Sequence, residues 1–318
     1  MSVSPPLSAA LPPTVSSAAL DDFAVVRATG DDAVAFLHGQ LTQDIAGLDR
    51  DARFAGYCSA KGRLMATMAV WRAPQADEGG GLFLLVRRDI ADALVKRLSL
   101  FVLRAKVRLA VAPAHAQGIW TGEAGVPELE AAVGPLPRTA WQRADLPSGT
   151  WIAAPCASAA CARWWRIAEG DAPPAGEAAR WRADDLAAGL AWIGAATQDL
   201  FIPQTVNLDL AGGVSFTKGC YPGQEIVARS HYRGTVKRRT AFGRLAGAAA
   251  HGPAPGTDVY DAARPDEPCG RLVDASGPDG AALLFEVTLA SLPDGDLRLG
   301  APDGPRIEVL PLPYALAA

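Results

Sequence analysis

The sequence lacks the motifs that mark several large enzyme classes. It contains no GxxxxGK(S/T) phosphate loop, no GxGxxG dinucleotide fingerprint, no HExxH zinc motif and no GxSxG nucleophile elbow. Each of these motifs supplies a backbone shape or a ligand set on which its chemistry depends. We therefore do not expect a P-loop NTPase, a Rossmann-type dehydrogenase, a zinc protease of this type or an α/β-hydrolase.

Long apolar runs and a strong net charge are missing as well. No segment approaches the roughly 20 apolar residues of a membrane helix, and the net charge of −4 is too small to recruit nucleic acid or membrane by its field. The first basic residue is Arg27, so the start of the chain resembles neither a secretory signal nor a transit peptide. We interpret residues 1–19 as a disordered leader on a cytoplasmic protein that does not contact membranes.

Cysteine is sparse, and its spacing excludes the usual metal and disulfide frameworks. The five cysteines are odd in number and form no CxxC pair. Cys156 and Cys161 have no nearby histidine that could complete a zinc site. We predict no metal site and five reduced thiols, as in a reducing compartment.

Short elements alternate along the first third of the chain. The pattern predicts a helix with its cap at Thr29 or Asp31, an apolar stripe through Val34, Leu37 and Leu41, and a second helix at 91–103. Strands are predicted at 23–28, 54–58, 64–71, 82–86 and 106–111. This order is typical of a ferredoxin-like α/β domain.

The rest of the sequence shows a different pattern of predicted secondary structure. Strands at 151–154 and 163–167 interrupt a Pro- and Ala-rich middle region. After Arg239, short runs at 241–245, 271–273, 282–287 and 306–310 alternate with Gly/Pro/Asp turns, which indicates a small antiparallel barrel or sandwich. We predict an α+β fold with domains at 20–112, 113–238 and 239–318, and we allow the first two to interleave along the chain.

The segment 201–239 carries most of the chemistry. Gly219 frees the backbone, and the order Tyr-Pro-Gly-Gln at 221–224 predicts a type II turn followed by a helix at 224–229. Cys220 is then expected on an exposed turn before a helix N-terminus and near Lys218, where positive charge stabilises a thiolate. The alternative is that Cys220 is a small buried hydrophobe, the commoner arrangement of a free cysteine. His231 can act as its base only if the fold brings the two together.

Positive charge gathers after this turn. Two interpretations stay open for the basic run: a solvated face, or an anion site for the glutamate tail of a folate or for a phosphate backbone. The basic run consists of Arg229, Arg233, Lys237, Arg238 and Arg239.

The turn and its neighbours resemble a known family. The octapeptide at 218–225 is similar to the KGC(Y/F)xGQE signature of the YgfZ family, and further landmarks match at 20–23, 39–44, 60–62, 201–204, 207–208, 212–213, 227–229, 232–234 and 312–314. The resemblance implies a three-lobed aminomethyltransferase-like fold with a C-terminal antiparallel β-barrel. The octapeptide consists of Lys218, Gly219, Cys220, Tyr221, Pro222, Gly223, Gln224 and Glu225.

The resemblance also implies a ligand, tetrahydrofolate or a derivative. Its implied contacts are Phe23, Trp181, Gln204, Asn207 and Arg229. Phe23 stands where family members can carry tryptophan, so it keeps a stacking face and lacks the indole N–H. From composition and pattern alone, Phe23 and Trp181 are ordinary core residues.

One departure separates the chain from the related glycine-cleavage aminomethyltransferases, which carry an acidic pair on the strand after the hairpin at 59–63. The matching residues are Ala66 and Thr67, which cannot move a proton as a carboxylate does. We therefore expect a folate-dependent accessory factor for iron–sulfur cluster assembly or repair, with Cys220 as its functional thiol and client or assembly proteins as partners. It would support tRNA modification indirectly, without direct nucleic-acid contact. The alternatives are a one-carbon transferase with an altered catalytic group and an RNA-binding module.

Overall fold

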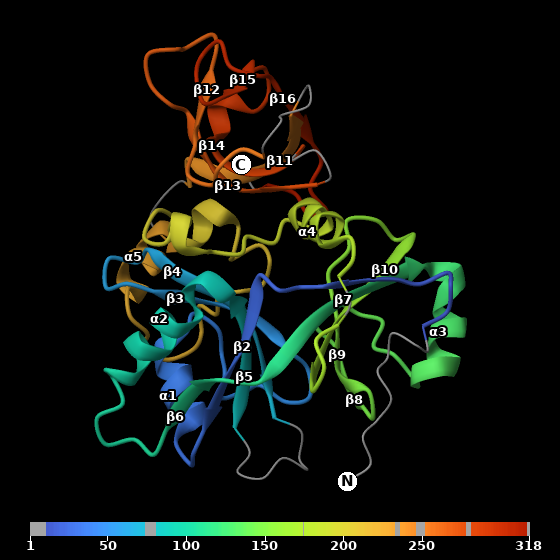
Figure 1. Cartoon of the computed structure of the whole chain (residues 1–318). Helices are drawn as coiled ribbons and strands as arrows, with labels where there is room; N and C mark the ends of the chain where they lie inside the picture. Colours follow the sequence, from blue (N-terminus) through green and yellow to red (C-terminus); the bar gives the residue numbers. More distant parts are fainter. Residues whose placement is uncertain are drawn as a thin grey trace. The chain divides into compact units, whose positions relative to one another are not determined.

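The computed structural model describes residues 11–73, 81–173, 175–232, 236–245, 252–277 and 281–316. The chain divides into two compact units. The first unit comprises Met1–Ala55 and Met68–Ala178, and the second comprises Gly56–Thr67 and Ala179–Ala318. This division does not test the three predicted domains, whose boundaries stay a prediction. Figure 1 shows the elements that build both units.

One sheet carries the ferredoxin-like pattern that the sequence predicts. Its strand order is β3-β4-β5-β2-β6, and the helices α1 (Ala33–Gln40) and α2 (Arg88–Ser99) belong to the same stretch of chain. The boundaries between the two units along the sequence fall within β3 and within β4. The strands are β2 (Phe23–Thr29), β3 (Arg53–Cys58), β4 (Leu64–Arg72), β5 (Leu82–Arg87) and β6 (Arg108–Val111).

Both helices of this stretch correct the sequence prediction. The N-cap position of α1 is Asp32, rather than Thr29 or Asp31, and no side chain caps the helix. The Asp32 carboxylate instead accepts a hydrogen bond of 2.8 Å from the backbone N–H of Lys106. Helix α2 spans Arg88–Ser99 and not 91–103. The apolar side chains of Leu100 and Leu103, which extended the predicted helix, lie on a turn beyond its end and are exposed.

A second five-stranded sheet completes the first unit. Its order is β1-β7-β10-β9-β8, with β1 (Ser16–Ala19) paired antiparallel to β7. The prediction of a disordered leader is therefore wrong for Ser16–Ala19, because a short strand here satisfies backbone groups of β7. Helix α3 (Val126–Val133) packs its apolar face into the core of this sheet, against residues that include Ile119, Trp151 and Trp164. The other strands are β7 (Ala114–Gly122), β8 (Arg143–Leu146), β9 (Gly149–Ala153) and β10 (Cys161–Glu169).

The second unit ends in a six-stranded antiparallel sheet with the order β15-β12-β13-β14-β11-β16. A bridge between Arg298 and Arg306 joins its two end strands, so the sheet is a nearly closed barrel, orange to red in Figure 1. The prediction of a C-terminal β-barrel is confirmed. Its strands are β11 (Arg238–Leu245), β12 (Asp258–Asp261), β13 (Gly270–Ser276), β14 (Ala282–Thr288), β15 (Leu297–Leu299) and β16 (Ile307–Leu310).

Three further helices of the second unit position the site. They are α4 (Ala178–Ala187), the short 3-10 helix η4 (Pro203–Val206) and α5 (Gln224–Tyr232). Among the described residues, no helix is both long and apolar enough to cross a membrane.

Candidate functional site

The turn before α5 has the geometry that its sequence predicts. The N–H of Gln224 donates to the carbonyl of Tyr221 at 3.2 Å, and Gly223 has a φ of +79°. A positive φ at the third residue is the mark of a type II turn, and glycine adopts it without strain. Helix α5 then begins at Gln224, as predicted, and extends to Tyr232 rather than ending at residue 229.

The turn is packed backbone to backbone on the hairpin between β3 and β4. A Cβ on Gly223 would stand 2.6 Å from the Cα of Gly62 and would collide with the carbonyl oxygen of Ser59. Gly62 has a positive φ of +72°, and a Cβ on it would stand 2.8 Å from the Cβ of Ile226 on α5. Both glycines are therefore required by a close approach of two chain segments. All of these residues belong to the second unit.

Cys220 lies on this turn, one residue before Tyr221, and is exposed. All five cysteines are among the described residues, and Cys220 is the exposed one. Cys58 is the opposite case, because burial raises the pKa of its thiol to about 12. Solvent therefore reaches one thiol of the site, which favours the exposed interpretation of Cys220 over the buried one.

Aromatic contacts hold Lys218 next to the turn and His231 on α5. The ammonium group of Lys218 lies 4.9 Å from the centre of the Tyr221 ring, a cation–π contact that holds positive charge beside the turn. Burial raises the pKa of the Tyr221 phenol, so this ring stays neutral at physiological pH. His231, the base that the sequence left open, stacks on Phe216 with 3.7 Å between ring centres. Phe216 is a contact that no sequence signal pointed to.

Gln204 and Asn207, two of the implied folate contacts, join η4 to its neighbours. Asn207 adopts a left-handed φ of +56°, and its amide nitrogen donates to the carbonyl of Thr240 on β11 at 2.8 Å. The amide nitrogen of Gln204 donates to the carbonyl of Val227 on α5 at 2.7 Å. Both side chains are fully buried. The Oε1 atom of Gln204 is a buried acceptor that meets no donor among the described residues.

Phe23 and Trp181, the implied aromatic contacts, are buried core residues in this conformation. Phe23 begins β2 in the first unit, and the Arg87 guanidinium lies 5.5 Å from its ring centre. Trp181 lies in α4 of the second unit. Neither side chain has exposed surface.

The basic run is largely paired with acids. Arg229 pairs with Glu225 at 3.0 Å, and Arg238 pairs with Glu286 at 3.3 Å. Arg239 is buried and pairs with Asp209 at 2.6 Å. Arg233 lies outside the described residues.

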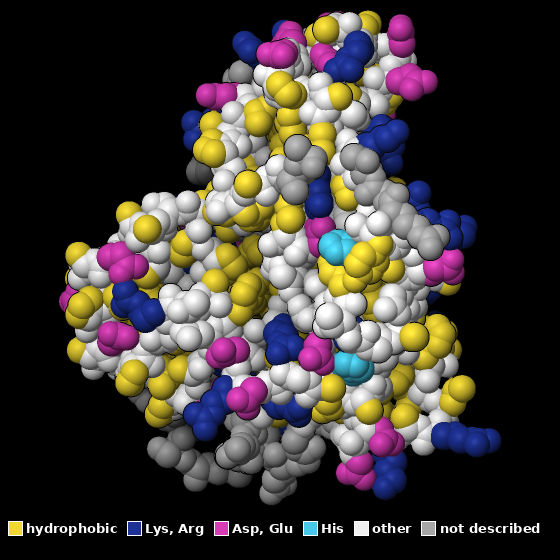
Figure 2. All heavy atoms as spheres, turned by 180° about the vertical axis from the view of Figure 1, so that it is seen from behind, with side chains coloured by type: hydrophobic (Ala, Val, Ile, Leu, Met, Phe, Trp, Pro, Cys, Tyr) yellow, Lys and Arg dark blue, Asp and Glu magenta, His cyan; other side chains and the backbone are white. Residues whose placement is uncertain are grey.

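These ion pairs take positive charge away from the surface that an RNA backbone would need. In Figure 2, Lys/Arg and Asp/Glu side chains are interspersed over the face that it presents. Of the two interpretations of the basic run, the solvated face with local ion pairs fits this arrangement better than a phosphate track.

Hydrogen bonds hold the side chain of Thr67, one of the two residues that match the acidic pair of the aminomethyltransferases. The Thr67 hydroxyl donates to the carbonyl of Ala191 at 2.7 Å and accepts from the N–H of Ile193 at 2.9 Å. Thr67 and Ala66 have no exposed surface. The hydroxyl therefore serves the local structure and is not free to handle a proton of a ligand.

Two further connections in the second unit could not be found by sequence reasoning. The Ser59 hydroxyl donates to the Asp199 carboxylate at 3.1 Å, across 140 residues of chain. The Tyr314 hydroxyl donates to the carbonyl of Gly189 at 3.2 Å and accepts from the Asn207 amide at 3.4 Å. Burial is the main cause that raises the pKa of Tyr314 to about 12. Only the family landmark at 312–314 drew attention to Tyr314.

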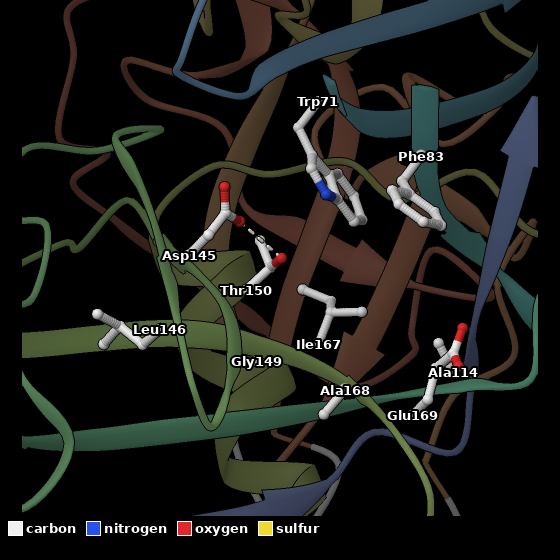
Figure 3. Close-up of a pocket in the computed structure, with 10 residues that line it drawn as sticks. All are labelled: Trp71, Phe83, Ala114, Asp145, Leu146, Gly149, Thr150, Ile167, Ala168 and Glu169. Atoms are coloured by element: carbon white, nitrogen blue, oxygen red, sulfur yellow. Dashed lines mark hydrogen bonds between the residues drawn. The ribbon is translucent and has the colours of Figure 1, made fainter. Parts of the chain in front are cut away.

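A pocket of about 290 Å³ lies in the first unit, apart from these residues. The rings of Trp71 and Phe83 are stacked, with 5.6 Å between their centres (Figure 3). The Thr150 hydroxyl donates to the Asp145 carboxylate at 2.9 Å. Leu146, Ile167 and Ala168 supply aliphatic lining. None of the predicted site residues lines this pocket.

Two known proteins that are similar to this chain carry the same name. The chain is 32% identical over 333 residues to the tRNA-modifying protein YgfZ of Klebsiella pneumoniae, covering 98% of this chain and 96% of that protein. It is 34% identical over 267 residues to the protein of the same name from Sodalis glossinidius, covering 79% and 77% of the two chains. No family model matches the chain.

The fold resembles that of a solved enzyme. The glycine cleavage system aminomethyltransferase T of Bartonella henselae superposes with a TM-score of 0.71 at 16% identity, over 95% of this chain and 86% of that chain. At this identity the likeness establishes an aminomethyltransferase-like fold and carries no activity with it.

Proposed function

The chain belongs to the family of the tRNA-modifying protein YgfZ, and from this premise we propose that it is a folate-binding accessory protein for the assembly or repair of iron–sulfur clusters. Through the enzymes it maintains, it would support tRNA modification. The observation that carries the proposal is the exposed Cys220 on a turn locked to the hairpin at 59–63 by Gly223 and Gly62. Such a lock gives a thiol a fixed position at the surface.

The thiol would act together with a partner. Among the described residues, no group of three or more His, Cys, Asp or Glu side chains is placed to hold a metal ion. Iron–sulfur clusters are commonly held by four cysteine thiolates. Cys220 would therefore supply one sulfur ligand or one attacking thiolate, and the client or assembly protein would supply the rest.

The folate part of the proposal concerns the second unit. The buried Oε1 atom of Gln204 has no donor among the described residues, and an N–H group of a ligand would satisfy it. Asn207 and Trp181 would contribute to the same ligand only if their buried surfaces open. Bound folate would supply a rigid ring system and a one-carbon carrier, while the chain's own residues would orient it.

A one-carbon transferase is the second candidate, and the aminomethyltransferase-like fold is the observation in its favour. The Thr67 hydroxyl, bonded to Ala191 and Ile193, stands where those enzymes carry a carboxylate. Without a proton carrier at that position, we expect no turnover of methylene- or formyl-tetrahydrofolate.

Calorimetric titration of tetrahydrofolate into the purified protein tests the ligand. We expect binding by the wild type and by Cys220→Ala, and weaker binding by Gln204→Ala and Trp181→Phe. Because Gln204 and Trp181 are buried, their variants need an unchanged circular dichroism spectrum before the result counts. No heat of binding with the wild type would overturn the folate part, and turnover of the folate would favour the transferase.

A further inference from the structure

Exposed apolar side chains concentrate on one turn of the first unit. Leu100, Phe101 and Leu103 are 71%, 49% and 87% exposed, and Val111 is 38% exposed on β6 nearby in sequence. Among the described residues, the other large apolar side chains with such exposure are Tyr232 and Val309. Single exposed apolar residues are ordinary, whereas a cluster marks an interaction site. We call Leu100, Phe101 and Leu103 the apolar knob.

The knob is held outward by the end of α2. The buried face of that helix consists of Ile90, Ala91, Leu94 and Leu98, so the unit's own core is already covered. The N–H of Phe101 donates to the carbonyl of Leu98 at 3.0 Å, and the N–H of Val102 donates to that of Ser99 at 3.2 Å. These bonds continue the helix as a tight turn, and the knob side chains point away from the core as a result. Figure 1 shows this turn between α2 and β6 at the outer border of the sheet.

Basic side chains predominate in the segment that carries the knob. Residues 96–108 contain five basic residues and no Asp or Glu, on a chain whose net charge is −4. The Lys106 ammonium pairs with Asp31 at 3.0 Å, and Lys96, Arg104 and Arg108 are exposed. An apolar knob with a basic border is complementary to an apolar groove with an acidic border.

The neighbouring strand enlarges this surface. Strand β6 is the end strand of its sheet in the described pairings, bonded to β2 alone. Arg108 and Val111 on β6 are both exposed. Basic and apolar side chains therefore continue from the turn along the edge strand β6. The main-chain groups at the edge of a sheet are available to a partner.

We propose that the apolar knob docks into a groove on a partner protein, lined by apolar side chains and bordered by Asp and Glu. A lipid surface fits less well, because the knob continues into the edge strand β6, whose main-chain N–H and C=O groups a protein partner can pair and lipid cannot. A knob of three side chains buries a small area, so the complex is of the weak, transient class. Its affinity depends on a few central side chains and on salt.

Photocrosslinking followed by measured binding tests the proposal. Benzoylphenylalanine replaces Leu103 in the full-length protein expressed in its native cells, and adducts are identified by mass spectrometry. The same residue at Val309 is the matched control, because Val309 is 41% exposed on the barrel. The identified partner is then purified, and its affinity is measured for the wild type, Leu103→Ser, Arg104→Glu and Val309→Ser.

We expect one dominant protein adduct at position 103 that is absent at 309. Leu103→Ser and Arg104→Glu should each weaken binding by about tenfold or more, salt should weaken the wild-type complex, and Val309→Ser should change nothing. Equal adducts at both positions, or a partner whose affinity ignores Leu103 and Arg104, would overturn the proposal. So would flotation of the protein with phosphatidylglycerol vesicles that depends on Leu103. None of these outcomes depends on folate or on Cys220.

Discussion

Gly223 and Gly62 meet so closely that a Cβ on Gly223 would stand 2.6 Å from the Cα of Gly62. One glycine belongs to the motif turn, and the other belongs to the hairpin between β3 and β4. The contact joins two segments 161 residues apart in sequence and fixes the turn that carries Cys220. Substitutions at this contact should therefore affect stability and thiol position together.

Gly223→Ala should destabilise the protein more than a positive φ alone explains. Both Gly223 and Gly212 have a positive φ, of +79° and +73°, but a Cβ on Gly212 would meet nothing within 4 Å. We expect a loss of about 1–2 kcal/mol for Gly212→Ala from backbone strain, and a clearly larger loss for Gly223→Ala, where Ser59 must also move. Urea unfolding of the two variants measures the difference. Equal losses would mean that the two segments are not held in contact.

The five thiols should differ in reactivity. Cys220 is exposed, whereas Cys58 is buried and has a pKa of about 12. Alkylation with iodoacetamide at pH 8, followed by mass spectrometry, should modify Cys220 first and leave Cys58 unmodified until the protein unfolds. The half-buried Cys156, Cys161 and Cys269 serve as internal references. Labelling of Cys58 ahead of Cys220 would contradict the assignment of Cys220 as the accessible thiol.

Thr67→Val should destabilise the fold without creating a cavity. The substitution keeps the volume and removes the hydroxyl, which leaves the carbonyl of Ala191 and the N–H of Ile193 without their partner. We expect a loss of about 1–3 kcal/mol in the free energy of unfolding. Thr67→Ser keeps the hydroxyl and is the matched control. If Thr67→Val unfolds at the same urea concentration as the wild type, these hydrogen bonds do not hold the segment in place.

Glu286 should give the stability a distinct pH dependence. Burial raises the pKa of its carboxyl, and the nearby Arg238 opposes this only in part. Because the folded-state pKa is raised above the unfolded value, the stabilising contribution is complete below the unfolded pKa and is lost as pH rises through the folded one. The melting temperature of the wild type should therefore fall relative to Glu286→Gln as pH rises from 4 into the neutral range. The exposed Glu308→Gln is the control, and a parallel course of wild type and Glu286→Gln would refute the assignment.

Local patterns were enough to predict much of the fold. The run of β-branched and apolar residues at 23–28, the Pro-Gly order at 222–223 and the short barrel runs at 241–245 and 282–287 each act over a few residues, and the structure contains all of them. The helix prediction failed at Leu100 and Leu103, whose apolar spacing looks like core and whose side chains are exposed. Helical periodicity does not distinguish a core face from an exposed interaction site.

The site was predicted less completely, because its contacts are long-range. The pairing of Asn207 with Thr240, of Gln204 with Val227 and of Arg239 with Asp209 depends on how distant segments return to each other. The sequence identified these residues as candidate site residues. It did not reveal that their polar groups bond to other segments of the protein. The turn that carries Cys220 is the exception, since it is local. The sequence left open whether Cys220 is exposed or buried, and the structure shows it exposed.

The most direct test of the central claim is complementation of cells that lack this protein, read out as the activity of an iron–sulfur enzyme normalised to its protein level. The variants are Cys220→Ser and, as a matched control, Cys269→Ser, a half-buried thiol of the barrel. The account predicts that the wild type and Cys269→Ser restore the activity and that Cys220→Ser does not, at equal expression. Full restoration by Cys220→Ser would contradict it.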